Sequence, residues 1–136
     1  MFQALFEAER KAMFDAGPLA AVRYGYFEGV AAPMAVVLDF DAGSWVLTVD
    51  PDDDTVLVAD SSAGLPPDLR FEPAPEESPW TTVAGLSAQW IWIMYNHQGY
   101  EDGLQFSFHL GSARECQIQL MAMASTWQVY ELRRVA

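Results

Sequence analysis

Basic residues are scarce in this chain of 136 residues. Lysine and arginine together number 7, against 19 aspartate and glutamate residues, so the formal net charge is −12. A protein that binds nucleic acid by neutralising phosphates needs a basic face, and docking on an anionic membrane surface needs basic clusters. We therefore expect no nucleic acid and no membrane among the partners.

Cysteine and long apolar runs are also nearly missing. A single cysteine, Cys116, excludes a disulfide within the chain and a zinc site built from several cysteines. No apolar run approaches the roughly 18 residues of a membrane-spanning helix, and the first residues lack the basic and apolar regions of a signal peptide. These absences predict a cytoplasmic protein.

The sequence has no recognisable catalytic motif. It contains no glycine-rich phosphate loop, no Gly-x-Ser-x-Gly elbow and no His-Glu-x-x-His pair. The two histidines, His97 and His109, have no spacing that defines a site, and the turn at residues 50–54 lacks the glycine and glutamate of a calcium-binding loop. We expect no catalytic residues, no metal and no cofactor, and an enzyme stays open as the less favoured reading.

Hydrophobic residues make up 51% of the chain, enough to bury a core. Apolar residues recur at steps of three and four over residues 1–16, which predicts a helix that ends at Gly17 and Pro18. From Leu19 onward the period changes to two, which predicts strands. The expected fold class is α+β, with the N-terminal helix packed on an antiparallel β-sheet meander of about six to eight strands.

The length predicts one domain over residues 1–136. Strand patterns form a first meander at residues 19–60 and a second at residues 80–136. Between them, residues 61–79 hold five of the eight prolines. Proline cannot donate to a strand ladder, so this segment is predicted to be a long surface loop.

Residues 87–95 are apolar on both faces of the expected strand. Trp90 and Trp92 share one face, and Ile91 and Ile93 share the other. A strand that is apolar on both faces is usually covered on both sides. We therefore expect this strand near the centre of the sheet, with the helix over one face and with Trp92 buried.

The next two strands alternate, with Leu104, Phe106, Phe108, Leu110, Ile118 and Leu120 expected to point inward. Their outward positions are polar but almost uncharged: Gln105, Ser107, His109, Gln117 and Gln119. Neutral side chains lose water at lower cost than charged ones, so such a face suits contact with a partner. Equally, the face could be covered by the long loop or by a second copy of the chain.

Residues 39–77 contain eleven acids and one base, which accounts for −10 of the net charge of −12. The densest part is the turn that carries Asp50, Asp52, Asp53 and Asp54. A negative field of this kind speeds encounter with a basic partner. We therefore add these four residues to the candidate partner-binding set.

The most distinctive stretch follows the expected central strand. It contains Trp90 and Trp92, then a turn with Asn96, Gln98, Gly99, Tyr100, Asp102 and Gly103. Asparagine and glycine suit left-handed or tight-turn positions, which favours a structural role for the motif.

This stretch resembles a little-characterised group of small acidic bacterial proteins with a Trp-rich strand and an Asn-x-Gln-Gly-Tyr-x-Asp-Gly turn. More loosely, the whole chain is similar to immunity proteins encoded beside bacterial toxins, which are acidic, combine a helix with a sheet and act by binding a partner. The resemblance implies no catalytic residue.

The favoured function is therefore protein-protein binding, with an immunity-like inhibitor of a basic partner or toxin as its specific form. One alternative is a small-ligand binder or enzyme, with a pocket between helix and sheet lined by Trp90, Trp92 and Tyr95. Another is a structural subunit of a homo-oligomer.

Overall fold

The computed structural model describes residues 3–4, 7–111 and 114–132. Its helical elements are α1 (Glu7–Asp15), the 3-10 turn η1 (Ser61–Ala63) and α2 (Trp80–Val83). Its strands are β1 (Gln3–Ala4), β2 (Leu19–Tyr26), β3 (Ala35–Phe40), β4 (Gly43–Val49), β5 (Val56–Asp60), β6 (Arg70–Pro73), β7 (Ala88–Tyr95), β8 (Glu101–Gly111), β9 (Arg114–Met123) and β10 (Thr126–Leu132).

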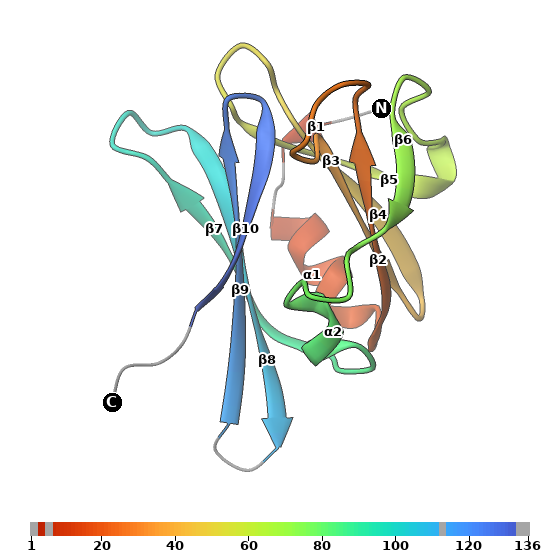
Figure 1. Ribbon diagram of the computed structural model, residues 1–136. Coiled ribbons are helices and arrows are strands. Elements are labelled where there is room, and N and C mark those ends of the chain that lie inside the picture. Colours follow the sequence, from red (N-terminus) through yellow and green to blue (C-terminus); the bar gives the residue numbers. More distant parts are fainter. Residues whose placement is uncertain (1–2, 5–6, 112–113, 133–136) are drawn as a thin grey trace.

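These strands form two antiparallel sheets rather than one. The first sheet has six strands in the order β1-β5-β4-β3-β2-β6, and the second has four in the order β10-β9-β8-β7. Figure 1 shows the two sheets facing each other, with α1 in the space between them. The α+β class and the antiparallel pairing are confirmed, whereas the single sheet of six to eight strands is wrong. Alternation along a strand predicts its two faces but not the sheet to which it belongs.

The main core lies between the inner faces of the two sheets. Leu38 and Leu47 from the first sheet and Phe106 and Leu120 from the second belong to one cluster, and all four are fully buried. Trp127 of β10 joins this cluster, and its indole Nε1 donates to the carbonyl oxygen of Leu47 at 3.2 Å. Burial of side chains of this size contributes about 1.5–3 kcal/mol each, so this layer holds the two sheets together.

Helix α1 closes one open side of this sandwich. Its Met13 is fully buried in the core cluster, and Gly17 follows the helix with φ +84°, which ends it as the sequence predicts. The predicted helix over residues 1–16 was too long, because Gln3 and Ala4 form β1 and pair with β5. Residues 1–2 and 5–6 of that prediction lie outside the described residues.

The proline-rich segment at residues 61–79 contains more structure than a loop. Its strand β6 pairs with β2, and Leu65, Leu69 and Phe71 pack on the outer face of the first sheet. There they cover a small buried cluster made of Ala35, Val37, Val46 and Ala59. The segment therefore covers the first sheet and not the neutral residues of β8 and β9, which belong to the second sheet.

Strand β7 is at the edge of the second sheet, not at a centre. It pairs with β8 alone, through Ile91 opposite Phe106 and Trp92 opposite Gln105. Ile91 packs against the core, but Trp90 is 59% exposed and Trp92 42% exposed. The prediction of a buried Trp92 is wrong, because the second apolar face of this strand is open to solvent.

Candidate functional site

The outer face of the second sheet brings the neutral side chains and the tryptophans together. Strand pairing places Trp92 opposite Gln105, Gln105 opposite Gln119, and Gln119 opposite Tyr130, so one row crosses all four strands. The row on one side holds Trp90, Ser107 and Gln117, and the row on the other holds Met94, Gly103, Met121 and Gln128. We call these residues the amide-aromatic face; none of them carries a charge.

Three glutamines of this face form a chain of hydrogen bonds. Gln119 Nε2 donates to Gln105 Oε1 at 3.5 Å, and Gln105 Nε2 donates to Gln117 Oε1 at 3.3 Å. Gln119 Nε2 also contacts the sulfur of Met94 at 3.3 Å. These bonds fix the amide orientations before any partner arrives, which lowers the entropy lost when the face is covered.

Large apolar groups surround the glutamines. The Trp90 and Trp92 ring centroids are 6.5 Å apart, and Tyr130 on the opposite edge of the sheet is 44% exposed. Met123, the last residue of β9, is 52% exposed. Exposed tryptophan, tyrosine and methionine on an uncharged background are typical of the centre of a protein interface.

Two of the predicted outward residues differ from the others. Ser107 lies on this face but is 1% exposed, and its Oγ has no hydrogen-bond partner within the part of the chain that the structure describes. Ser107 is therefore covered by its neighbours and is not available for contact with a partner. His109 lies at the end of the face, with its Nε2 3.7 Å from a Glu115 carboxylate oxygen.

The predicted acidic turn is not on this face but beside its end. Asp54 Oδ1 accepts a hydrogen bond from the backbone N–H of Ser125 at 2.8 Å, in the turn between β9 and β10. Asp50 and Asp53 accept from backbone N–H groups of their own turn, and the bonds with Thr55 lower the pKa of Asp53. Asp52 is exposed. The carboxylates of Asp50, Asp53 and Asp54 therefore have structural partners as well as charge.

The rest of the acidic segment is likewise spread over several local interactions. Asp39 accepts from Arg23 at 3.1 and 3.2 Å. Asp60 caps η1 by accepting from the Ser62 N–H at 2.8 Å, and this bond lowers the pKa of Asp60. Asp39 and Asp60 therefore make local interactions within the first sheet and the turn that follows it, and the partner-binding role of the acidic segment stays a prediction.

The motif after β7 builds the β7–β8 turn around one asparagine. Asn96 Oδ1 accepts from the N–H groups of Gln98 and Tyr100 at 2.9 and 3.2 Å, and Asn96 Nδ2 donates to Asp102 at 3.4 Å. Gly99 has φ +86°, which is the left-handed conformation that the sequence predicts. Gly103 instead lies within β8, where an added Cβ would be 2.9 Å from the Met121 sulfur.

Sequence reasoning missed the two tryptophans and Tyr130 as surface residues of one face. Alternation along the strand correctly places Trp90 and Trp92 on one face and Ile91 and Ile93 on the other. What decides between burial and exposure is the position of β7 at a sheet edge, and no local pattern carries that information. The uncharged outward residues of β8 and β9 could have indicated the exposure of these tryptophans, because one face of a sheet continues across neighbouring strands.

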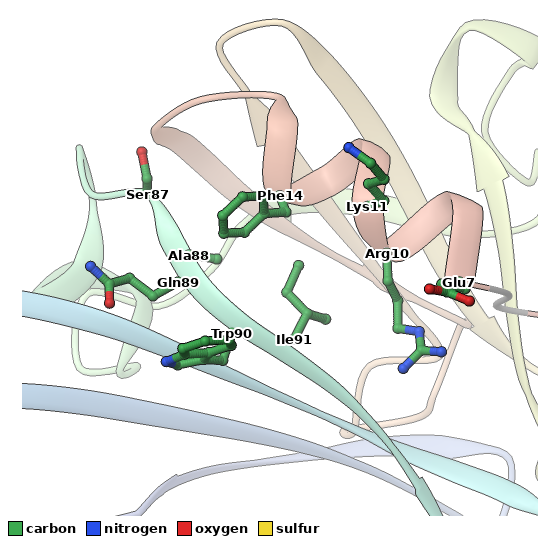
Figure 2. Close-up of a pocket in the computed structure, with 9 residues that line it drawn as sticks. All are labelled: Glu7, Arg10, Lys11, Phe14, Ser87, Ala88, Gln89, Trp90 and Ile91. Carbon is green, nitrogen blue, oxygen red and sulfur yellow. The ribbon is translucent and has the colours of Figure 1, made fainter.

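A cavity of about 760 Å³ lies between α1 and β7. It is lined by Glu7, Arg10, Lys11, Phe14, Ser87, Ala88, Gln89, Trp90 and Ile91. The alternative of a small-ligand binder or enzyme expects a pocket between helix and sheet, but of its three expected wall residues only Trp90 lines this cavity; Trp92 and Tyr95 do not. Figure 2 shows Arg10 extending from α1 on the side of β7, whereas Lys11 points away from Arg10.

Two features are absent from the described ranges. Residues 3–4, 7–111 and 114–132 contain no group of three or more histidine, cysteine, aspartate or glutamate side chains that could hold a metal ion. No helix in this part of the chain is long and apolar enough to cross a membrane. Cys116 is buried in the core.

A family model described as a family of unknown function (DUF6334) matches residues 13–136. This match agrees with a little-characterised family, whereas the resemblance carried by the motif from Trp90 to Phe108 and the likeness to immunity proteins stay predictions. No curated protein and no solved structure gives a significant match.

Proposed function

We propose that this chain, which belongs to that family of unknown function, acts by binding another protein through the amide-aromatic face. The observation that carries the proposal is an uncharged, aromatic sheet face on a molecule with a net charge of −12. Interface centres are depleted in charge and enriched in tryptophan, tyrosine and methionine. The face has this composition, and ordinary solvent-facing sheets do not.

The size of the face favours a macromolecular partner. Four paired strands with a spacing of about 4.8 Å give a width of about 15 Å. Trp92 and Tyr130 lie on the two edge strands of this sheet, and the hydrogen-bonded glutamines lie on the strands between them. A partner that covers both aromatic groups would desolvate them together, and aromatic groups of this kind dominate the binding energy of interfaces.

The charge of the molecule favours a partner different from itself. Two copies would each bring a charge of −12, and like charges oppose approach. A partner with basic groups around its contact surface would instead be attracted by the acidic surroundings of the face, including the Asp50–Asp54 turn beside the β9–β10 turn. An inhibitor of a basic protein, in the manner of an immunity protein, is the specific form that we favour.

Affinity capture with matched variants tests this proposal. The wild-type protein, Trp92→Ala/Tyr130→Ala and Phe27→Ala/Val30→Ala would be immobilised and exposed to an extract of the cells that make it. Phe27 and Val30 are also exposed apolar residues, but they lie in the connection between β2 and β3. We expect the wild type and the Phe27/Val30 control to retain the same protein, and the face variant to bind it at least about 100-fold more weakly.

Equal retention by all three proteins would contradict the use of this face, and so would the absence of any protein retained by the wild type. Light scattering on the wild type over a range of concentrations covers the alternative of a homo-oligomer. A dimer that the Trp92/Tyr130 change abolishes would replace the foreign partner with a second copy.

A further inference from the structure

The cavity between α1 and β7 is separate from the amide-aromatic face except at Trp90, and it has different chemistry. We propose that it binds a small organic monoanion, whose carboxylate pairs with Arg10 and whose apolar body packs between Phe14 and Trp90. This inference does not depend on the proposed protein partner.

Arg10 provides the anchor for the carboxylate. Its Nε is buried and has no hydrogen-bond partner within the described ranges. Other basic residues of the described chain have carboxylate partners: Lys11 with Asp15 at 2.8 Å, and Arg23 with Asp39 at 3.1 Å. A buried donor without a partner is costly, and a guanidinium matches the geometry of a carboxylate with two parallel hydrogen bonds. Because Arg10 lines the cavity, its guanidinium can pair with a carboxylate there, and a small movement of the side chain would bring the buried Nε into that contact.

Apolar side chains provide the place for the body of the ligand. Helical spacing puts Phe14 four residues after Arg10, on the same side of α1. Phe14 is 50% exposed, and Trp90 and Ile91 line the cavity from β7. Figure 2 shows these side chains around one space, with Ala88 at the strand. A volume of about 760 Å³ lies within the range of small-molecule sites, which combine apolar walls with a few polar anchors.

The other charges restrict the ligand to a single negative charge. Glu7 lines the same cavity, the Lys11 ammonium there is paired with Asp15 at 2.8 Å, and the whole molecule carries −12. Each additional negative charge on a ligand would be repelled by Glu7 and by this net charge, so phosphates and tricarboxylates are disfavoured. Ser87 and Gln89 lie on the strand side and can hydrogen-bond a polar substituent of the ligand body.

Calorimetric titration with a matched pair of probes tests the site without any mutation. The probes are 1-naphthylacetate and its neutral counterpart 1-naphthylacetamide, which have the same shape and differ in charge. For the wild-type protein we expect a Kd for the carboxylate of about 1 mM or tighter, from the binding efficiency of small ligands. The amide should bind about tenfold more weakly, because the charge-assisted hydrogen bonds are lost.

Variants then assign the preference to Arg10. Arg10→Gln should reduce the difference between the two probes to within about twofold, whereas Arg10→Lys keeps the charge and should restore part of it. Arg70→Gln removes an exposed arginine on the first sheet and should change nothing. Trp92→Ala/Tyr130→Ala should also bind the carboxylate normally, which separates this site from the protein-binding face.

Three results would overturn the proposal: no binding of 1-naphthylacetate at about 10 mM, equal affinity of the wild type for both probes, or an unchanged preference in Arg10→Gln. The first two concern the wild-type protein alone, so they do not depend on whether a variant folds.

Discussion

The outer faces of the two sheets differ in what covers them. On the first sheet, Val37 and Val46 are fully buried because Leu65, Leu69 and Phe71 of the following segment pack over them. On the second sheet, Trp90 and Trp92 are exposed, and no comparable cluster forms over them within the described residues. Within the described residues, a segment of the chain thus covers the outer apolar face of the first sheet, and no such segment covers the second sheet. The open face is the one that we expect a partner to cover.

The largest expected effect separates the core from the open face. Phe106→Ala removes a fully buried ring between the sheets and should lower the free energy of unfolding by about 3–5 kcal/mol. Trp92 lies opposite Gln105 on the open face and is partly exposed. Trp92→Ala should therefore lower the free energy of unfolding by less than about 1 kcal/mol. Denaturant unfolding of both variants measures the difference. Equal losses would mean that Trp92 is buried after all.

The covered face should give an intermediate effect. Gly25 of β2 is shaped for Phe71, because an added Cβ would be 2.6 Å from the Phe71 ring. Gly25→Ala should therefore displace Phe71 and cost about 1–3 kcal/mol. Gly29→Ala has open space around it but a positive φ of +77°, so its cost reports backbone strain alone. If Phe71→Ala makes Gly25→Ala harmless, the two effects share one contact; if their costs add, the covering contact is not the cause.

The core tyrosine should make stability depend on alkaline pH. Burial raises the pKa of Tyr24 to about 12, and the Tyr24 hydroxyl accepts a hydrogen bond from Trp80 Nε1 at 2.7 Å. Because the folded pKa exceeds the unfolded value near 10, the contribution of Tyr24 is complete below pH 10 and is lost as the pH rises toward 12, by up to about 3 kcal/mol.

Tyr24→Phe tests this assignment. At pH 7 the variant should lose about 1–3 kcal/mol, because the Trp80 donor is left without its acceptor. Between pH 10 and 12 its stability should fall less steeply than that of the wild type. Burial also raises the pKa of Tyr26, but that residue is present in both proteins and cancels in the comparison. Parallel curves over this range would refute the role of Tyr24.

The smallest expected effect concerns the acidic turn. Asp54→Ala removes the acceptor for the Ser125 N–H, which joins this turn of the first sheet to the β9–β10 turn of the second, and should cost about 1 kcal/mol. Asp54→Asn keeps an acceptor and tolerates the positive φ of 58°, so it should cost less. Asp52→Ala is the matched control, since Asp52 is exposed, and should be neutral in thermal unfolding. Equal effects of Asp54→Ala and Asp52→Ala would show that the bond to Ser125 is not stabilising.

Local patterns predict much of this fold. Strand β3 lies within the first predicted meander, and Leu104, Phe106 and Ile118 point into the core because strict alternation defines the faces of a strand. The side chain of Leu110 lies outside the described residues. Pairing between distant strands is not local, so the division into two sheets did not follow from these patterns. The short strand β6, which ends at Pro73, was not predicted for the same reason: it forms because β2 offers it a free edge.

The candidate sites show the same limit. The neutral glutamines of β8 and β9 were recognised because their pattern is local, and the structure brings Gln105, Gln117 and Gln119 together. The cavity beside α1 joins Arg10 to Trp90, which are 80 residues apart in the sequence, so only the packing of α1 near β7 brings them together. The partner-binding role that charge counting predicts for residues 39–77 stays a prediction.

The most direct test of the open face is photo-crosslinking inside the cells that make the protein. The photoreactive residue p-benzoylphenylalanine would replace Trp92 or Tyr130 on the amide-aromatic face, or Phe27 as the exposed control. We expect a covalent adduct with one foreign protein from positions 92 and 130, and none from position 27. An adduct that forms equally from position 27, or no adduct from either position on the face, would contradict the account.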